Sequence, residues 1–164
     1  MSTVALWTAV DQLIDNARSP HDLRAHGLHL LAVRRWRSLG LDVPRSLVEA
    51  ERDASFVALS APLVLAEVRA ACAGPILIMK GPELATRYPD PALRPYGDLD
   101  LLVEDADAAH AALVASGFTP HRDRDPETFH HLQPLQSPRF PVRVEVHMRP
   151  SWLPGNAALP VSCV

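Results

Sequence analysis

Proline divides this chain into two parts with different folding possibilities. Sixteen of the 164 residues are proline, and most of them follow Gly74. Proline breaks the interior of a helix and is excluded from central strands. We therefore expect short elements and many loops after Gly74, whereas the part before it is free to form long helices.

The first part has the apolar periodicity of amphipathic helices, with apolar residues recurring every three or four positions. We expect one helix that ends near Ser19, a second from there to about Gly40, and a third from about Pro44 to Ala71 with a kink at Pro62. Three histidines lie on or near the second helix, but no carboxylate or cysteine completes a metal set, so we interpret them as surface or half-buried residues: His21, His26 and His29.

The second part has short apolar runs bounded by turn residues, which are typical of strands. The predicted strands cover 75–79, 98–103, 118–121, 142–148 and, more weakly, 129–135, and the predicted helices cover 83–88 and 105–116. The sequence therefore predicts an α+β fold, with a helical N-terminal part followed by a small mixed sheet.

Composition and charge exclude several classes of protein. The formal net charge is −3, which argues against a general nucleic-acid binder because such proteins need a clustered basic surface. No uninterrupted apolar stretch approaches the roughly 20 residues of a membrane span, and the N-terminus lacks the early positive charge of a secretory signal. Cys72 and Cys163 belong to no CxxC pair. We expect a cytoplasmic protein that does not bind membranes.

Carboxylates at strand positions are the residues that indicate a chemical function. Side chains two apart in a strand share a face, so Asp98 and Asp100 project together, as do Glu145 and His147 on a later strand. Carboxylates that converge in a folded site repel one another unless a cation bridges them, and Mg²⁺ prefers such oxygen ligands. Two ions about 3.5–4 Å apart can activate a hydroxyl and stabilise leaving pyrophosphate. The alternative is a solvent-facing pair of acids at a strand start.

The chain has one lysine, Lys80, and its fifteen other Lys or Arg residues are all arginine. A single lysine in a chain that otherwise uses arginine indicates a position that needs a compact point charge. The alternative is an ion pair with Asp98 or Glu145.

The segment ILIMKGPELATRYPDPALRPYGDLDLLV and the later Glu145-Val146-His147 resemble the nucleotidyltransferase superfamily with the polymerase-β-like fold. More narrowly, they resemble an uncharacterised bacterial nucleotidyltransferase family. The motifs are Lys80-Gly81, the Tyr-Pro-x-Pro segment at 88–91, and Arg-Pro-x-Gly-Asp-x-Asp-Leu-Leu-Val at 94–103. The resemblance covers about residues 75–148.

The resemblance implies that three carboxylates are catalytic and bind metal, with Mg²⁺ as the cofactor and Mn²⁺ as an alternative: Asp98, Asp100 and Glu145. Glu145 is also the candidate acceptor of a proton. Three further residues are implied in nucleotide binding: Lys80, Gly81 and Arg94. For Arg94 the alternative is a loop-anchoring role, and His147 either orients a metal ligand or packs as a neutral core residue.

These residues lead to an expected organisation and activity. The helical region spans 1–72, the nucleotidyltransferase-like core 73–150 and a tail 151–164. The expected activity is Mg²⁺-dependent transfer of a nucleoside monophosphate from an NTP, with ATP as the default, to a hydroxyl of an unknown acceptor. An oligomer or a partner protein is expected to complete the site if the chain alone does not. The alternatives are a non-catalytic nucleotide-binding or regulatory module, and a protein-modifying antidote of a toxin pair.

Overall fold

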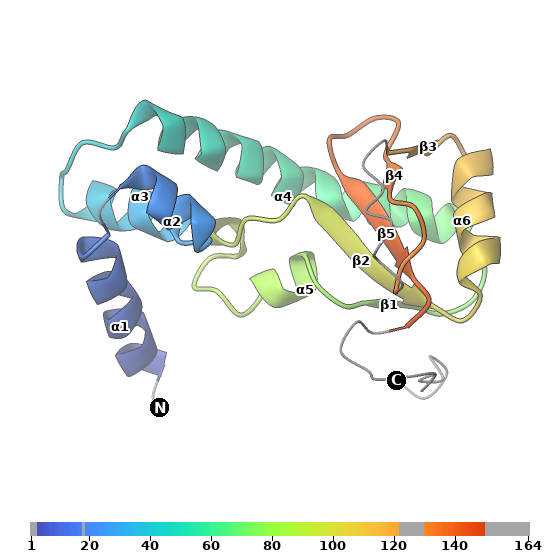
Figure 1. Ribbon diagram of the computed structural model, residues 1–164, viewed down its shortest axis with the longest axis horizontal. Helices are drawn as coiled ribbons and strands as arrows, with labels where there is room; N and C mark the ends of the chain where they lie inside the picture. The colour runs from blue at the N-terminus through green and yellow to red at the C-terminus, as the bar shows by residue number, and fades with distance from the viewer. Residues whose placement is uncertain (1–2, 18, 122–129, 150–164) are drawn as a thin grey trace.

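The structure is a computed structural model that describes residues 3–17, 19–121 and 130–149. It confirms the predicted α+β architecture, with helices first and a small mixed sheet after them (Figure 1). The predicted tail, 151–164, lies outside the described residues.

The first part of the chain is built from helices with short connections. Its helices are α1 (Thr3–Asp15), α2 (Pro20–Ala25), α3 (His29–Ser38) and α4 (Arg45–Ala71). The Ser19 side chain caps α2 by accepting a hydrogen bond from the Asp22 amide at 3.2 Å. The prediction of a single second helix is wrong, because the chain leaves the helical path between α2 and α3. Gly27 lies there at φ +67°, a backbone conformation that terminates helices and that glycine adopts without strain.

Helix α4 is the longest element and continues through Pro62 to Ala71. Its most apolar 18-residue window has a mean hydropathy of 1.5, which is enough for a membrane span by length and composition. Only 22% of that window is buried. One helix of this kind is weak support for membrane insertion, because a long core helix can have the same length and composition.

A five-stranded sheet forms the second part within the described residues. Its strands are β1 (Ile76–Ile78), β2 (Asp98–Val103), β3 (Thr119–Pro120), β4 (Leu135–Gln136) and β5 (Arg143–His147), in the spatial order β1-β2-β5-β4-β3. The shorter helical elements are α5 (Pro82–Ala85), the 3₁₀ turn η1 (Pro91–Leu93) and α6 (Ala106–Ala115). β2 and β5 are parallel neighbours, whereas the other pairs in the sheet are antiparallel.

Two apolar clusters hold these elements together. The first packs α4 and α6 against one face of the sheet, and its members include Val64, Leu101, Leu113 and Val146. The second joins α1, α2 and α3 to the beginning of α4 and to Leu93 of η1. Because α4 contributes to both clusters, it runs from the helical part to the back of the sheet (Figure 1). The opposite sheet face, which carries the alternate residues of β2 and β5, presents the predicted site.

Candidate functional site

Asp100 is a buried carboxylate at the centre of the sheet. The parallel register of β2 and β5 places it directly opposite Glu145. Its side chain is 3% exposed, and its Oδ1 accepts hydrogen bonds from Lys80 Nζ at 3.1 Å and from His147 Nε2 at 3.0 Å. A carboxylate buried to this extent needs such donors, because desolvation penalises its charged form.

The electrostatics of this carboxylate favour its ionised form. Burial raises the pKa of Asp100, but the hydrogen bonds from His147 and Lys80 outweigh burial and lower the pKa below its ordinary value of 3.8. Asp100 is therefore a negative charge held inside the sheet at neutral pH. Of the two interpretations of Lys80, the structure has the ion pair, and the partner is Asp100 rather than Asp98 or Glu145.

Asp100, Glu145 and His147 form a group of three potential metal ligands. One nitrogen or oxygen atom from each residue lies within 4.8 Å of the others. Glu145 Oε2 is 3.8 Å from His147 Nε2, which is too long for a hydrogen bond. The Nδ1 atom of His147 is buried and has no hydrogen-bond partner among the described residues. His147 therefore combines a core position, 1% exposed, with a direct contact to the predicted site.

A second imidazole, His131, faces Glu145 and was missed from the sequence. Residues 131 and 147 form an antiparallel bridge, and His131 Nδ1 lies 2.6 Å from the carbonyl oxygen of Leu132. Because a carbonyl oxygen only accepts, Nδ1 carries the proton, and in the neutral ring Nε2 presents its lone pair. This lone pair faces Glu145 Oε2 at 3.7 Å. Two acceptor atoms face each other there, an arrangement that a cation stabilises. The only feature of the sequence that could have indicated a role for His131 is the His130-His131 pair.

Asp98 has a different environment from Asp100. Its Oδ2 lies 4.0 Å from an Arg143 guanidinium nitrogen, and the two side chains are 34% and 38% exposed. Within the part of the chain that the structure describes, Asp98 is not a member of the potential ligand group. The structure therefore brings Asp100 and Glu145 together and places Asp98 at the start of β2. Arg143, its neighbour on β5, was not singled out from the sequence.

The turn between β1 and α5 lies against the start of β2. Gly81 has φ +74° and ψ −121°, and a Cβ atom at this position would be 3.0 Å from the backbone oxygen of Asp98. Arg94 donates a hydrogen bond to the Gly81 carbonyl oxygen at 3.1 Å, and its guanidinium lies 5.9 Å from the centre of the Tyr96 ring. In the structure Arg94 thus anchors the turn, as the second interpretation of this residue expects.

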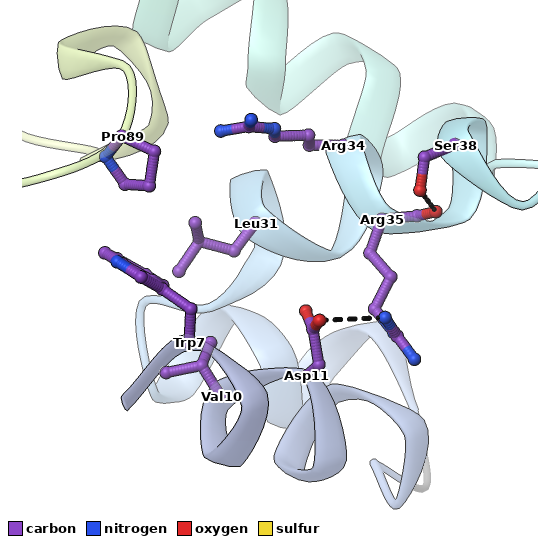
Figure 2. A pocket seen from close by; sticks show the side chains of 8 residues that line it. All are labelled: Trp7, Val10, Asp11, Leu31, Arg34, Arg35, Ser38 and Pro89. Carbon is purple, nitrogen blue, oxygen red and sulfur yellow. Dashed lines mark hydrogen bonds and ion pairs between the residues drawn. The ribbon is translucent and has the colours of Figure 1, made fainter. Parts of the chain in front are cut away.

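A separate pocket of about 420 Å³ lies between α1, α3 and the loop that carries Pro89 (Figure 2). An ion pair between Asp11 and Arg35, 2.9 Å apart, lies at one side of it. Its lining residues are Trp7, Val10, Asp11, Leu31, Arg34, Arg35, Ser38 and Pro89. None of the residues around Asp100 belongs to this pocket, so it is distinct from the predicted site.

Comparison with known proteins adds one finding to this geometry. The model of a protein family described as uncharacterised nucleotidyltransferase matches residues 21–160. The match includes every residue of the carboxylate and histidine site. No curated protein and no solved structure matches the chain.

Proposed function

The chain belongs to this family of uncharacterised nucleotidyltransferases, and on that premise we propose that it transfers a nucleoside monophosphate from an NTP to a hydroxyl of an acceptor. The observation that carries the proposal is the pair of carboxylates on neighbouring strands, with ionised Asp100 directly opposite Glu145. Nucleotidyl transfer needs negative oxygens held in place beside the triphosphate, and a strand-borne pair provides them.

The residues present fit a divalent metal ion, which we propose is Mg²⁺ or Mn²⁺. Metal bonds of about 2.1 Å place neighbouring ligands of an octahedral ion about 3 Å apart. The Asp100 and His147 atoms are 3.0 Å apart, and those of His147 and Glu145 are 3.8 Å apart. Asp100 and Glu145 would hold the ion, His147 would complete or orient the set, and Asp98 supplies a further carboxylate from the same face of β2. When bound, the ion offsets the charge that develops on the transferred phosphate.

Basic residues around the carboxylates support a position for the triphosphate. We place it near Lys80, Gly81 and Arg94, with Arg143 on the neighbouring strand as a further cation. Gly81 itself is buried against the start of β2, and Arg94 fixes the carbonyl of the Gly81 turn. Arg94 thus acts here as a positioning residue, whereas Lys80 carries a charge that can reach a phosphate oxygen.

The proposed reaction is an in-line displacement at the α-phosphorus. The acceptor oxygen forms a bond to the α-phosphorus while the bond to the bridging oxygen of the β-phosphate breaks, and pyrophosphate leaves with that electron pair. The proton of the acceptor hydroxyl goes to Glu145, whose carboxylate is partly exposed at 18%. The Nε2 lone pair of His131 lies 3.7 Å from the other side of this carboxylate.

Nucleotide binding is the first test, because it needs no acceptor. Thermal shifts are measured with ATP, CTP, GTP and UTP, each with and without Mg²⁺ or Mn²⁺. A nucleotide at 100 times its dissociation constant stabilises the fold by about 2.7 kcal/mol, which raises the melting temperature by about 2–4 °C per kcal/mol. Asp100→Asn should remove the metal-dependent part of this shift. Asp107→Asn makes the same chemical change at an exposed position of α6 and should leave the shift unchanged.

Pyrophosphate release with candidate acceptors then separates the two function classes. Release that requires Asp100 and Glu145 supports the transferase. A metal-dependent nucleotide shift with no release from any acceptor favours the alternative, a nucleotide-binding module without turnover. No shift with any nucleotide contradicts both.

A further inference from the structure

We propose that Lys80 is a resident counter-ion of Asp100 that gives way to the metal ion when nucleotide binds, so that metal and nucleotide bind cooperatively. This inference rests on the proposed function and concerns the order in which the site is filled. The contact that motivates it is the ion pair between Lys80 Nζ and Asp100 Oδ1, 3.1 Å apart. Lys80 is also the single lysine of the chain.

The first step is that Lys80 and a metal ion compete for the same carboxylate. The oxygen that Lys80 contacts also accepts the hydrogen bond from His147, so Oδ1 already has two donors. A divalent ion at Asp100 would lie within a few ångströms of the ammonium group, and like charges at that distance repel strongly in a partly buried site. The ammonium group and the ion therefore exclude each other.

The second step is the charge balance of the group. With the imidazoles counted as neutral and Asp98 balanced by Arg143, Asp100 and Glu145 contribute −2 and Lys80 contributes +1, which leaves −1. A divalent ion added to this set gives +1, whereas the same ion after departure of Lys80 gives 0. The balanced set is the one in which Lys80 has moved to another anion.

The third step is the difference in side-chain mobility between Lys80 and Asp100. The Asp100 side chain is 3% exposed on a central strand, whereas the Lys80 side chain is 46% exposed. Lysine has a flexible four-carbon stem, so it can leave the carboxylate while Asp100 stays in place. Lys80 is followed directly by the Gly81 turn, where we place the triphosphate, and that triphosphate is the anion that Lys80 would join.

The consequence is a coupling between the two ligands. A triphosphate that attracts Lys80 removes the competitor of the metal, and a metal that displaces Lys80 frees a cation for the triphosphate. Such coupling is reciprocal for binding equilibria and typically changes each affinity by about 5–150-fold. Without nucleotide, the wild-type site should therefore bind metal weakly.

The test measures Mn²⁺ binding, without nucleotide, by titration calorimetry and by the loss of the free-ion electron paramagnetic resonance signal. Lys80→Met should bind Mn²⁺ about tenfold more tightly than wild type, because the competitor is gone. Lys80→Arg keeps the charge and should stay close to wild type. Arg45→Met removes the same charge at an exposed position at the start of α4, where Arg45 pairs with Glu49, and it controls for a general change in charge, with less than about threefold effect.

A stability measurement covers the case in which Lys80→Met folds poorly. With a chelator present, this variant leaves Asp100 buried without its ammonium partner and should melt at a lower temperature than wild type. Mn²⁺ should restore more stability to the variant than to wild type. Equal Mn²⁺ affinity and equal Mn²⁺ stabilisation of wild type and Lys80→Met overturn the inference.

The same experiment separates failure of this inference from failure of the proposed function. If Asp100→Asn abolishes Mn²⁺ binding while Lys80→Met binds no more tightly than wild type, only the exchange of Lys80 is overturned. If Mn²⁺ binding is absent or independent of Asp100 in wild type and in Lys80→Met, the metal site and the proposed function are overturned together.

Discussion

Gly81→Ala is expected to destabilise the fold more than an ordinary glycine substitution, because Gly81 combines an unusual backbone conformation with a close contact. The residue has φ +74° and ψ −121°, outside the left-handed helical region that other residues visit. The added Cβ would lie 3.0 Å from the backbone oxygen of Asp98. That oxygen belongs to a central strand and cannot move aside as the end of a flexible side chain can.

The magnitude follows from these two contributions. A residue held in a sparsely populated backbone region costs on the order of 1–3 kcal/mol, and displacement of the Asp98 backbone adds to it. We therefore expect a loss of about 3 kcal/mol in the free energy of unfolding. The matched control is Gly27→Ala, which also has a positive φ, +67°, but has no atom within 4 Å of the added Cβ. Its loss should be about 1–2 kcal/mol.

Urea denaturation of both variants and of wild type provides the comparison. The structural argument requires Gly81→Ala to lose at least about 1 kcal/mol more than Gly27→Ala, with unchanged dependence on urea concentration. Because the displaced strand also carries Asp100, Mn²⁺ binding should weaken in Gly81→Ala and stay unchanged in Gly27→Ala. Equal stability losses would refute the reasoning, since they would mean that the turn does not press on β2.

Two further predictions concern histidines. His131→Ala should weaken Mn²⁺ binding several-fold, because the Nε2 lone pair of His131 faces Glu145. The control variant His130→Ala should have little effect on Mn²⁺ binding. Similar losses in both variants would mean that His131 is not part of the site. Burial lowers the pKa of His29 below its ordinary value of 6.5, so between the folded pKa and 6.5 the unfolded chain binds a proton that the folded chain does not. The free energy of unfolding should therefore fall as the pH decreases through that range. His29→Leu should show a smaller slope in denaturation measured from about pH 7 to pH 5, and an unchanged slope would contradict this prediction.

The fold could be predicted from the sequence wherever local periodicity decides the structure. Alternation along the strand placed Asp98 and Asp100 on one face of β2, and Glu145 and His147 on one face of β5. The break at Gly27 escaped prediction because the apolar pattern continues across it, and a helix end depends on one backbone conformation there. Local patterns describe faces and periods, but not where a regular element stops.

The pairing of side chains across strands could not be predicted in the same way. Asp100 lies opposite Glu145 because β2 and β5 pair in parallel with a particular register, and the two residues are 45 positions apart in the chain. The contact of His131 with Glu145 depends on a bridge between residue 131 and β5. The ion pair of Lys80 with Asp100, rather than with another carboxylate, depends on the position of the turn after β1. Each of these contacts is a property of the assembled sheet.

The assembled site explains how three acidic side chains can share one sheet face before any ligand binds. Two of the three carboxylates have a cationic neighbour, since Asp100 contacts Lys80 and Asp98 faces Arg143, whereas Glu145 faces the His131 lone pair and is partly exposed. The strength of these pairs differs with burial, because a charge inside the sheet is screened less than one at its end. Asp100 therefore depends most on its partner, and its counter-ion is the one whose replacement should have the largest effect on ligand binding. The half-exposed pair at Asp98 should be much easier to break.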